Sequence, residues 1–118
     1  MKTKLLFICS GNIDRSPCAS EIINKDFSEK FEARSGGVGP LTENPVTKEM
    51  IDWADKIFVM EDEHKWILLK NFPEVEDVNV LNIPNTFLRY DVELESVLRE
   101  KLGNWMEKNK SEKILGLI

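Results

Sequence analysis

Two hydrophobic patterns alternate along the 118-residue chain. Short continuous apolar runs predict buried strands of a parallel sheet, and longer stretches with apolar residues three and four positions apart predict helices that cover the sheet. The predicted strands are residues 4–9, 31–35, 56–60 and 78–83. The predicted helices are residues 16–30, 47–53, 61–70 and 92–108. Residues 111–118 are expected to form an apolar tail that packs on the domain or on another chain.

This alternation predicts an α/β fold, a three-layer sandwich. Its four-stranded parallel sheet is expected in the order 2-1-3-4, with helices on both faces and right-handed crossovers. The chain has no internal repeat and no linker, so residues 1–118 are predicted to form a single domain. Ligands of such sheets bind at the carboxyl ends of the strands, where the strand order reverses. The first strand lies at that reversal and ends in Cys9.

Two details of the pattern concern surfaces. The third helix is expected to bury Trp66, Leu68 and Leu69 and to leave His64 facing solvent. Residues 36–40 contain three glycines and a proline, a composition that excludes a helix and a regular strand. They predict either a loop that crosses near the end of the first strand or a plain surface turn.

Composition narrows the function classes. The formal net charge of −5 disfavours binding to nucleic acid or to an anionic membrane, and no apolar run approaches the roughly 20 residues that span a bilayer. Cys9 and Cys18 are too close in sequence to link distant elements, which fits a reducing cytoplasm. We expect Cys18, which lies within the first helix, to be a packing residue rather than a thiol that resolves an intermediate. No cluster has metal-ligand spacing, so neither a metal nor a cofactor is expected; the oligomeric state stays open.

The end of the first strand carries the candidate chemistry. Gly11 and Asn12 adopt positive φ most easily, so the backbone after Cys9 can curl and point its N–H groups inward. Ser16 and the proline after it predict the start of a helix, whose N-terminus favours anions. Arg15 adds a planar fork suited to two phosphate oxygens. The residues expected to bind a phosphoryl group are Ser10, Gly11, Asn12, Ile13, Asp14, Arg15 and Ser16.

In this arrangement Cys9 lies at the centre of the ring of donors, which would stabilise its thiolate as a nucleophile. Asn12 is expected either to hold the loop in a left-handed conformation or to be an ordinary turn residue. Ser16 is expected to donate to the thiolate as well as to cap the helix, or to cap it alone. The interpretation requires that the sulfur is open to solvent and that the guanidinium of Arg15 does not point outward.

The spacing of Cys9 and Arg15, with Leu6–Ile8 before them and Ser16-Pro17 after them, resembles the opening of the low-molecular-weight protein tyrosine phosphatases. The similarity continues through residues 34–37, 53–60 and 83–85. The resemblance implies a phosphomonoester hydrolase, with phosphotyrosine as the inherited substrate class, that forms a phosphocysteine at Cys9. The implied partners are a phosphorylated protein or a small phosphomonoester. It also implies that Ser35 supports the phosphate loop from beside it.

Two residues depart from the family pattern. Asp14 stands where the family commonly has a second cysteine, and Asn85 stands where it has the aspartate that serves as general acid. An amide cannot supply a proton to a leaving alkoxide. Asp91 is expected either to replace that acid or to cap the last helix. Phe87 and Tyr90 either wall the mouth of the pocket or belong to the core beside that helix.

These departures leave three function hypotheses. The first is a phosphatase, slowed by the missing acid and limited to good leaving groups unless Asp91 substitutes. The second is a phosphate-loop module that binds phosphorylated ligands with little turnover. The third is a relative of the arsenate reductases, which need further cysteines; only Cys18 is available, so this hypothesis is the least favoured.

Overall fold

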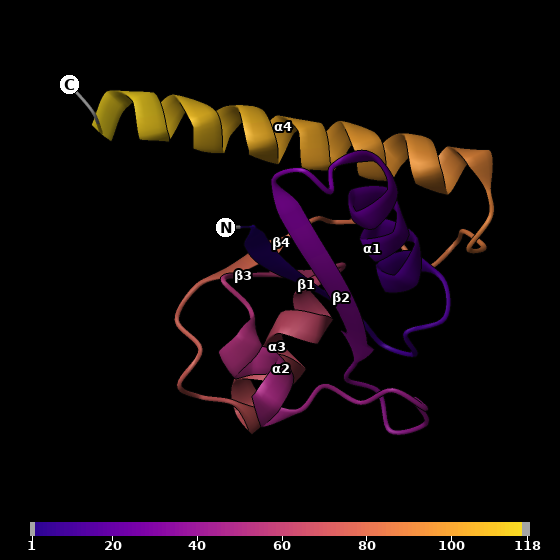
Figure 1. The fold of residues 1–118 in the computed structure, drawn as a ribbon. Coiled ribbons are helices and arrows are strands. Elements are labelled where there is room, and N and C mark those ends of the chain that lie inside the picture. Colours follow the sequence, from indigo (N-terminus) through magenta and orange to yellow (C-terminus); the bar gives the residue numbers. More distant parts are fainter. Residues whose placement is uncertain (1, 117–118) are drawn as a thin grey trace.

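The computed structural model describes residues 2–116, with side chains up to residue 109. Four parallel strands form one sheet in the order β2-β1-β3-β4, as predicted (Figure 1). The strands are β1 (Thr3–Cys9), β2 (Phe31–Gly37), β3 (Lys56–Val59) and β4 (Val78–Val80). The helices are α1 (Arg15–Asp26), α2 (Lys48–Trp53), α3 (Asp62–Asn71) and α4 (Val92–Gly116).

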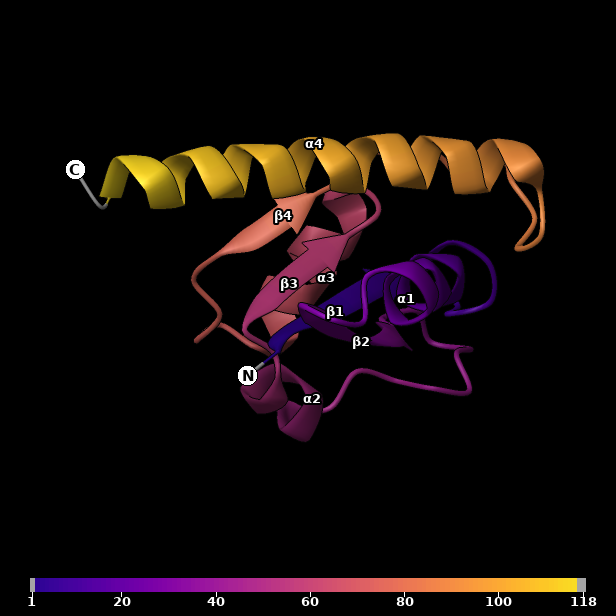
Figure 2. The same ribbon diagram turned by 45° about the horizontal axis from the view of Figure 1, so that its top comes forward.

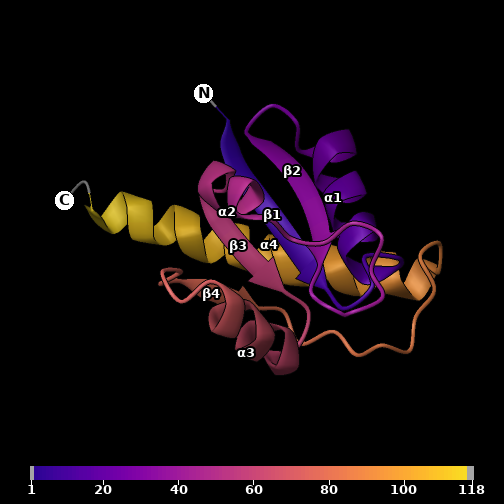
Figure 3. The ribbon, with the colours of Figure 1, turned by 90° about the horizontal axis from the view of Figure 1, so that it is seen from below.

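Helices cover both faces of the sheet, which confirms the predicted layers (Figures 1 and 3). Side chains alternate across β1, so Leu5 and Phe7 pack against α1 and α4, whereas Leu6 and Ile8 pack against α2 and α3. The 25-residue α4 crosses the sheet above β4 (Figure 2). No helix among the described residues is long and apolar enough to cross a membrane.

The glycine-rich segment crosses close to the end of β1. Cys9 pairs with Gly37 of β2, and the Gly39 amide donates to the Ser10 carbonyl at 2.8 Å. A Cβ atom on Gly37 would lie 2.6 Å from that carbonyl oxygen, so the close approach requires glycine. The interpretation as a crossing loop is therefore confirmed. The predicted strand end at residue 35 was two residues short. Gly36 and Gly37, which have no side chain to pack, still pair with β1 through their backbone.

The buried face of α3 differs from the prediction. The helix buries Leu68 as predicted, but Trp66 is 77% exposed, Leu69 is half-buried, and His64 is buried in addition. His64 and Leu68 are four positions apart and share a face, whereas Trp66 lies between them on the other side. The charged sequence around Trp66 gives no periodic signal strong enough to place it.

Three element ends also differ by three residues or more, and the first is that of α1, which ends at Asp26 rather than at residue 30. β4 ends at Val80 rather than at residue 83, because the chain turns away through Asn82, whose φ is 57°. The last helix continues to Gly116, so the tail predicted at 111–118 is helical as far as that residue. The packing that we expected of this tail lies outside the described side chains.

Candidate active site

The loop after β1 is wound around the sulfur of Cys9. Asn12 has φ 56°, the left-handed conformation, and its amide donates to the Cys9 Sγ at 3.2 Å. Ser16 Oγ lies 2.9 Å from the same sulfur. The Asn12 side-chain amide donates to Ser16 Oγ at 2.8 Å, which leaves the Ser16 hydrogen free to point at the sulfur. The expected left-handed conformation of Asn12 is confirmed, and the Ser16 hydroxyl lies beside the thiol.

Ser16 is not the helix cap. The helix α1 begins one residue earlier, at Arg15, and Asp14 occupies the capping position without a side-chain capping bond. Ser16 lies fully buried in the first turn, where its hydroxyl faces the sulfur. The positive end of the α1 dipole is therefore directed at the loop.

The loop is braced by side chains that the sequence analysis did not single out. Thr42 Oγ1 donates to the Gly11 carbonyl at 2.9 Å. The side-chain amide of Asn44 donates to Asn12 Oδ1 at 2.9 Å and to the Ser35 carbonyl at 2.8 Å. Ser35 thus takes part through its backbone. The sequence signal was indirect: both polar residues follow the glycines of the crossing loop.

Arg15 is only 2% exposed, and its guanidinium is anchored at one end. Its Nη1 donates to the Ile83 carbonyl at 2.7 Å and lies 3.2 Å from Glu61 Oε2. No hydrogen bond of the other two guanidinium nitrogens of Arg15, Nε and Nη2, is seen among the described residues.

Cys9 itself is 3% exposed. Its described partners are the loop amide and hydroxyl, and the sulfur is otherwise enclosed by the core. This burial corrects the expectation of a sulfur open to solvent, because residues of α1 and α4 pack with Cys9 in the same core. Cys18 is a second free thiol, packed in the same core. Burial raises the pKa of Cys18 to about 11, so its predicted packing role is confirmed.

His64 is 2% exposed, which corrects the expectation of a solvent-facing side chain. Its Nδ1 accepts the Glu61 amide at 3.1 Å, and its Nε2 lies 3.9 Å from Glu61 Oε2. Burial and the charge of Arg15 lower the pKa of His64, against the opposing effect of Glu61 and Glu63. The folded protein therefore favours the neutral imidazole beside the arginine anchor.

The free energy of unfolding should fall as the pH drops through about 6.5, the ordinary histidine pKa. The reason is that the unfolded chain takes up a proton that folded His64 resists, so stability rises with pH in this range. His64→Asn keeps an acceptor for the Glu61 amide and cannot titrate. Urea unfolding at pH 7.5, 6.5 and 5.5 should show a smaller loss in this variant than in the native chain. If the native chain and His64→Asn lost the same free energy of unfolding over this pH range, His64 would not be the source of the pH dependence.

The segment from residue 84 to residue 91, here called the acid loop, lies against the phosphate loop. Asp14 Oδ1 accepts the Arg89 amide at 2.9 Å, and Asp91 Oδ2 accepts the Leu88 amide at 2.8 Å. Asn85 is exposed, whereas Phe87 packs against the core under α1 and α4. The structure therefore favours core packing for Phe87. Asp91 directly precedes α4, although its carboxylate binds Leu88 rather than a helix amide.

Exposed apolar side chains surround the phosphate loop. We call this set the apolar rim: Ile13, Leu41, Leu88 and Tyr90, each at least 68% exposed. Ile13 belongs to the loop itself. Leu41 is next to Thr42, which bonds to Gly11 of the loop. Leu88 and Tyr90 flank Arg89, whose amide bonds to Asp14 of the loop. The apolar rim is therefore an exposed set of side chains tied to the phosphate loop through its neighbours.

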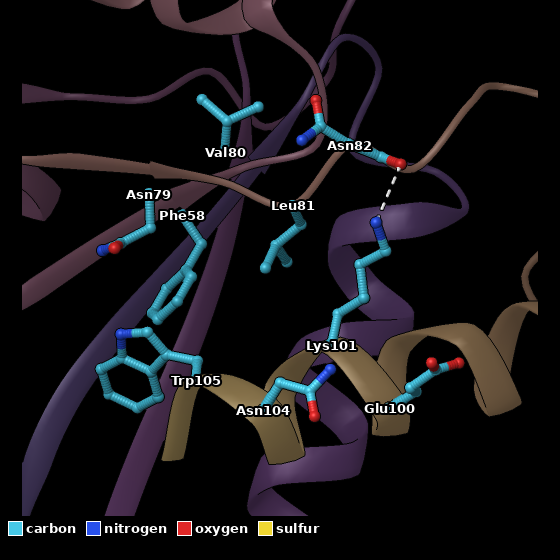
Figure 4. A pocket seen from close by; sticks show the side chains of 9 residues that line it. All are labelled: Phe58, Asn79, Val80, Leu81, Asn82, Glu100, Lys101, Asn104 and Trp105. Atoms are coloured by element: carbon cyan, nitrogen blue, oxygen red, sulfur yellow. Dashed lines mark hydrogen bonds between the residues drawn. The ribbon is translucent and has the colours of Figure 1, made fainter. Parts of the chain in front are cut away.

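A hollow of about 410 Å³ lies apart from this site, between β4 and α4 (Figure 4). On one side of the hollow Trp105 packs edge-on against Phe58, with 4.9 Å between the ring centroids. On the other side Lys101 Nζ lies 3.5 Å from the Asn82 carbonyl oxygen. No predicted phosphate-binding residue lines it. In the described part of the chain, no three His, Cys, Asp or Glu side chains are grouped to hold a metal ion.

Known phosphatases are similar to this chain in sequence. Residues 4–59 match the family model of the low molecular weight phosphotyrosine protein phosphatases. A protein-arginine-phosphatase of Geobacillus stearothermophilus is 27% identical, over 65% of this chain and 67% of its own length.

Two solved structures share the fold. The low molecular weight protein tyrosine phosphatase of Streptococcus pyogenes superimposes with a TM-score of 0.77 at 18% identity, covering 98% of both chains. Wzb of Vibrio vulnificus, solved with benzylphosphonate, gives 0.76 at 20% identity, covering 92% of this chain and 99% of its own. Residues 4–59 thus match the low molecular weight phosphotyrosine protein phosphatase family, and the chain as a whole shares the fold of these solved phosphatases.

Proposed function

We propose that the chain acts as a single domain that hydrolyses phosphomonoesters through a phosphocysteine at Cys9. The observation that carries the proposal is the sulfur held by the Asn12 amide and the Ser16 hydroxyl at 3.2 and 2.9 Å. These donors hold the sulfur in place as the proposed nucleophile. Both cysteines are free, which suits a reducing compartment such as the cytoplasm.

In the first step the thiolate attacks phosphorus, an S–P bond forms, and the bond from phosphorus to the leaving oxygen breaks. Arg15 and the backbone amides of residues 10–16 hold the remaining phosphoryl oxygens, where negative charge is spread in the transition state. Water then attacks phosphorus, releases inorganic phosphate and restores the thiolate. Every group in this scheme belongs to the chain or to the solvent.

The leaving oxygen needs a proton unless the alcohol is acidic. Asn85 occupies the position of the family's acid and has no proton to give at neutral pH. Asp91 is on the same loop, but its carboxylate accepts the Leu88 amide and serves as an acid only if that bond opens. We therefore propose a phosphatase whose rate depends strongly on leaving-group acidity.

Hydrolysis of p-nitrophenyl phosphate and phenyl phosphate tests this proposal. The native chain should strongly prefer the nitrophenyl ester, because phenol has a pKa of about 10 and leaves poorly without an acid. Asn85→Asp should raise kcat for phenyl phosphate by at least about tenfold and change the nitrophenyl rate much less. Asn104→Asp, an exposed change on α4, is the matched control and should alter neither rate.

Two other results would redirect the proposal. Equal turnover of both esters by the native chain would mean that another acid is present, and loss of phenyl phosphate turnover in Asp91→Asn would identify it. Binding of inorganic phosphate without turnover of either ester would favour the phosphate-binding module instead. Arsenate reduction stays the least favoured alternative, because the sequence offers Cys18 alone as a further thiol.

For the substrate we propose phosphotyrosine. The apolar rim suits an aromatic ring, and the benzylphosphonate bound to Wzb is an aromatic phosphonate. Phosphoarginine is the second candidate, since the curated relative is a protein-arginine-phosphatase. A guanidinium would favour a free carboxylate, yet Asp14 and Asp91 both accept backbone amides. Parallel hydrolysis of phosphotyrosine and phosphoarginine peptides should therefore favour the phosphotyrosine peptide, and the reverse order would select the second candidate.

A further inference from the structure

Asp14 makes an unusual use of its carboxylate. It occupies the capping position of α1, where an aspartate ordinarily accepts an amide of the first helical turn. Here the side chain makes no capping bond, and Oδ1 accepts the Arg89 amide at 2.9 Å, from a residue 75 positions away. The carboxylate therefore joins the last residues of the phosphate loop to the acid loop.

The acid loop has a second attachment to the same helix. The Arg89 side chain forms an ion pair with Glu21, two turns further along α1. Two hydrogen bonds close the turn between Leu88 and Asp91. The Leu88 amide donates to the Asp91 carboxylate, and the Asp91 amide donates to the Leu88 carbonyl. The segment is thus a braced turn mounted on α1, and Asp14 is the attachment nearest to Cys9 in the chain.

We propose that Asp14 is a positioning residue, which holds the acid loop over the phosphate loop so that Leu88 and Tyr90 contact the leaving group. The inference rests on the proposed function, since it assigns the leaving group to the acid loop and the phosphoryl group to residues 9–16. The affinity for a ligand that carries a leaving group therefore depends on the Asp14–Arg89 bond. The affinity for inorganic phosphate, which has no leaving group, does not depend on it.

Asp14 also places a negative charge beside the bound anion, and this effect must be separated from the bond. Asp14→Asn removes the charge and keeps a side-chain oxygen that accepts the Arg89 amide. Asp14→Ala removes both. Each variant should bind inorganic phosphate more tightly, because the repulsion between like charges is gone. Only the alanine variant should loosen the acid loop.

The experiment compares KM for p-nitrophenyl phosphate with the inhibition constant of inorganic phosphate. The ratio of KM to this constant should rise roughly threefold to tenfold in Asp14→Ala, the effect of about one hydrogen bond. In Asp14→Asn the ratio should stay within about twofold of the native value. A purely structural role would move both constants together. Equal ratios in the two variants would overturn the inference.

Hydrogen exchange gives a measurement that needs no turnover. The Arg89 amide should exchange faster in Asp14→Ala and stay protected in Asp14→Asn, while amides of β1 are unchanged in both. If the native chain proves inactive, this result still tests the bond, and phenylphosphonate binding replaces KM. An Arg89 amide that exchanges equally in all three proteins would show that Asp14 does not position the loop. Thermal melting of each variant verifies folding.

Discussion

Cys9→Ser is expected to reduce hydrolysis of p-nitrophenyl phosphate by on the order of 10³-fold or more, because a hydroxyl is a far weaker nucleophile than a thiolate. The loop amides and Arg15 remain in this variant, so inorganic phosphate should still bind with an affinity within about threefold of the native value. Steady-state kinetics and isothermal titration with phosphate measure the two effects separately.

Cys18→Ser is the matched control. Its thiol is packed in the core beside α1, and burial raises its pKa, so it is a poor nucleophile. The variant should keep most of the native activity at a somewhat lower melting temperature. Loss of activity in the folded Cys18 variant, or activity retained in the Cys9 variant, would contradict the assignment of the nucleophile.

The second large effect is expected from Arg15→Lys. An ammonium keeps the charge but cannot bond the Ile83 carbonyl, Glu61 and a phosphoryl group in one plane. We expect kcat/KM to fall by about 10²–10³-fold, the usual loss for one transition-state donor. The melting temperature should fall as well, because the buried carbonyl loses a well-placed partner. Kinetics and a thermal scan on the same preparation measure both changes.

Arg99→Lys is the control for this substitution. Arg99 pairs with Asp26 and Glu95 near the surface, where such pairs contribute little. Its activity and melting temperature should stay close to native values. If Arg15→Lys also kept kcat/KM within about threefold, the guanidinium would not be the group that binds the phosphoryl oxygens.

The sequence predicted the parts of this molecule that depend on local pattern. The apolar run before Cys9 is a central strand, and the glycine and asparagine after it turn the backbone as expected. Strand order followed from the alternation of strands and helices. The left-handed Asn12 and the hydroxyl of Ser16 were predictable because each acts within eight residues of Cys9.

The supports of the site were not predictable, because they come from distant parts of the chain. Asn44, Glu61 and Arg89 each reach the phosphate loop across more than thirty residues. Their sequence context is that of ordinary polar surface residues. The sequence analysis also required a sulfur open to solvent, whereas packing of α1 and α4 leaves Cys9 only 3% exposed.

The side-chain hydrogen bonds that lead to the sulfur form a chain in which each donor points toward Cys9. Asn44 donates to Asn12, Asn12 donates to Ser16, and the Ser16 hydroxyl is left to face Cys9. The electric field at the nucleophile is therefore set partly by a segment that follows β2 and never touches the sulfur. Exchanging residues 41–46 for those of a relative would therefore change the support of the thiol without changing the sequence of its own loop.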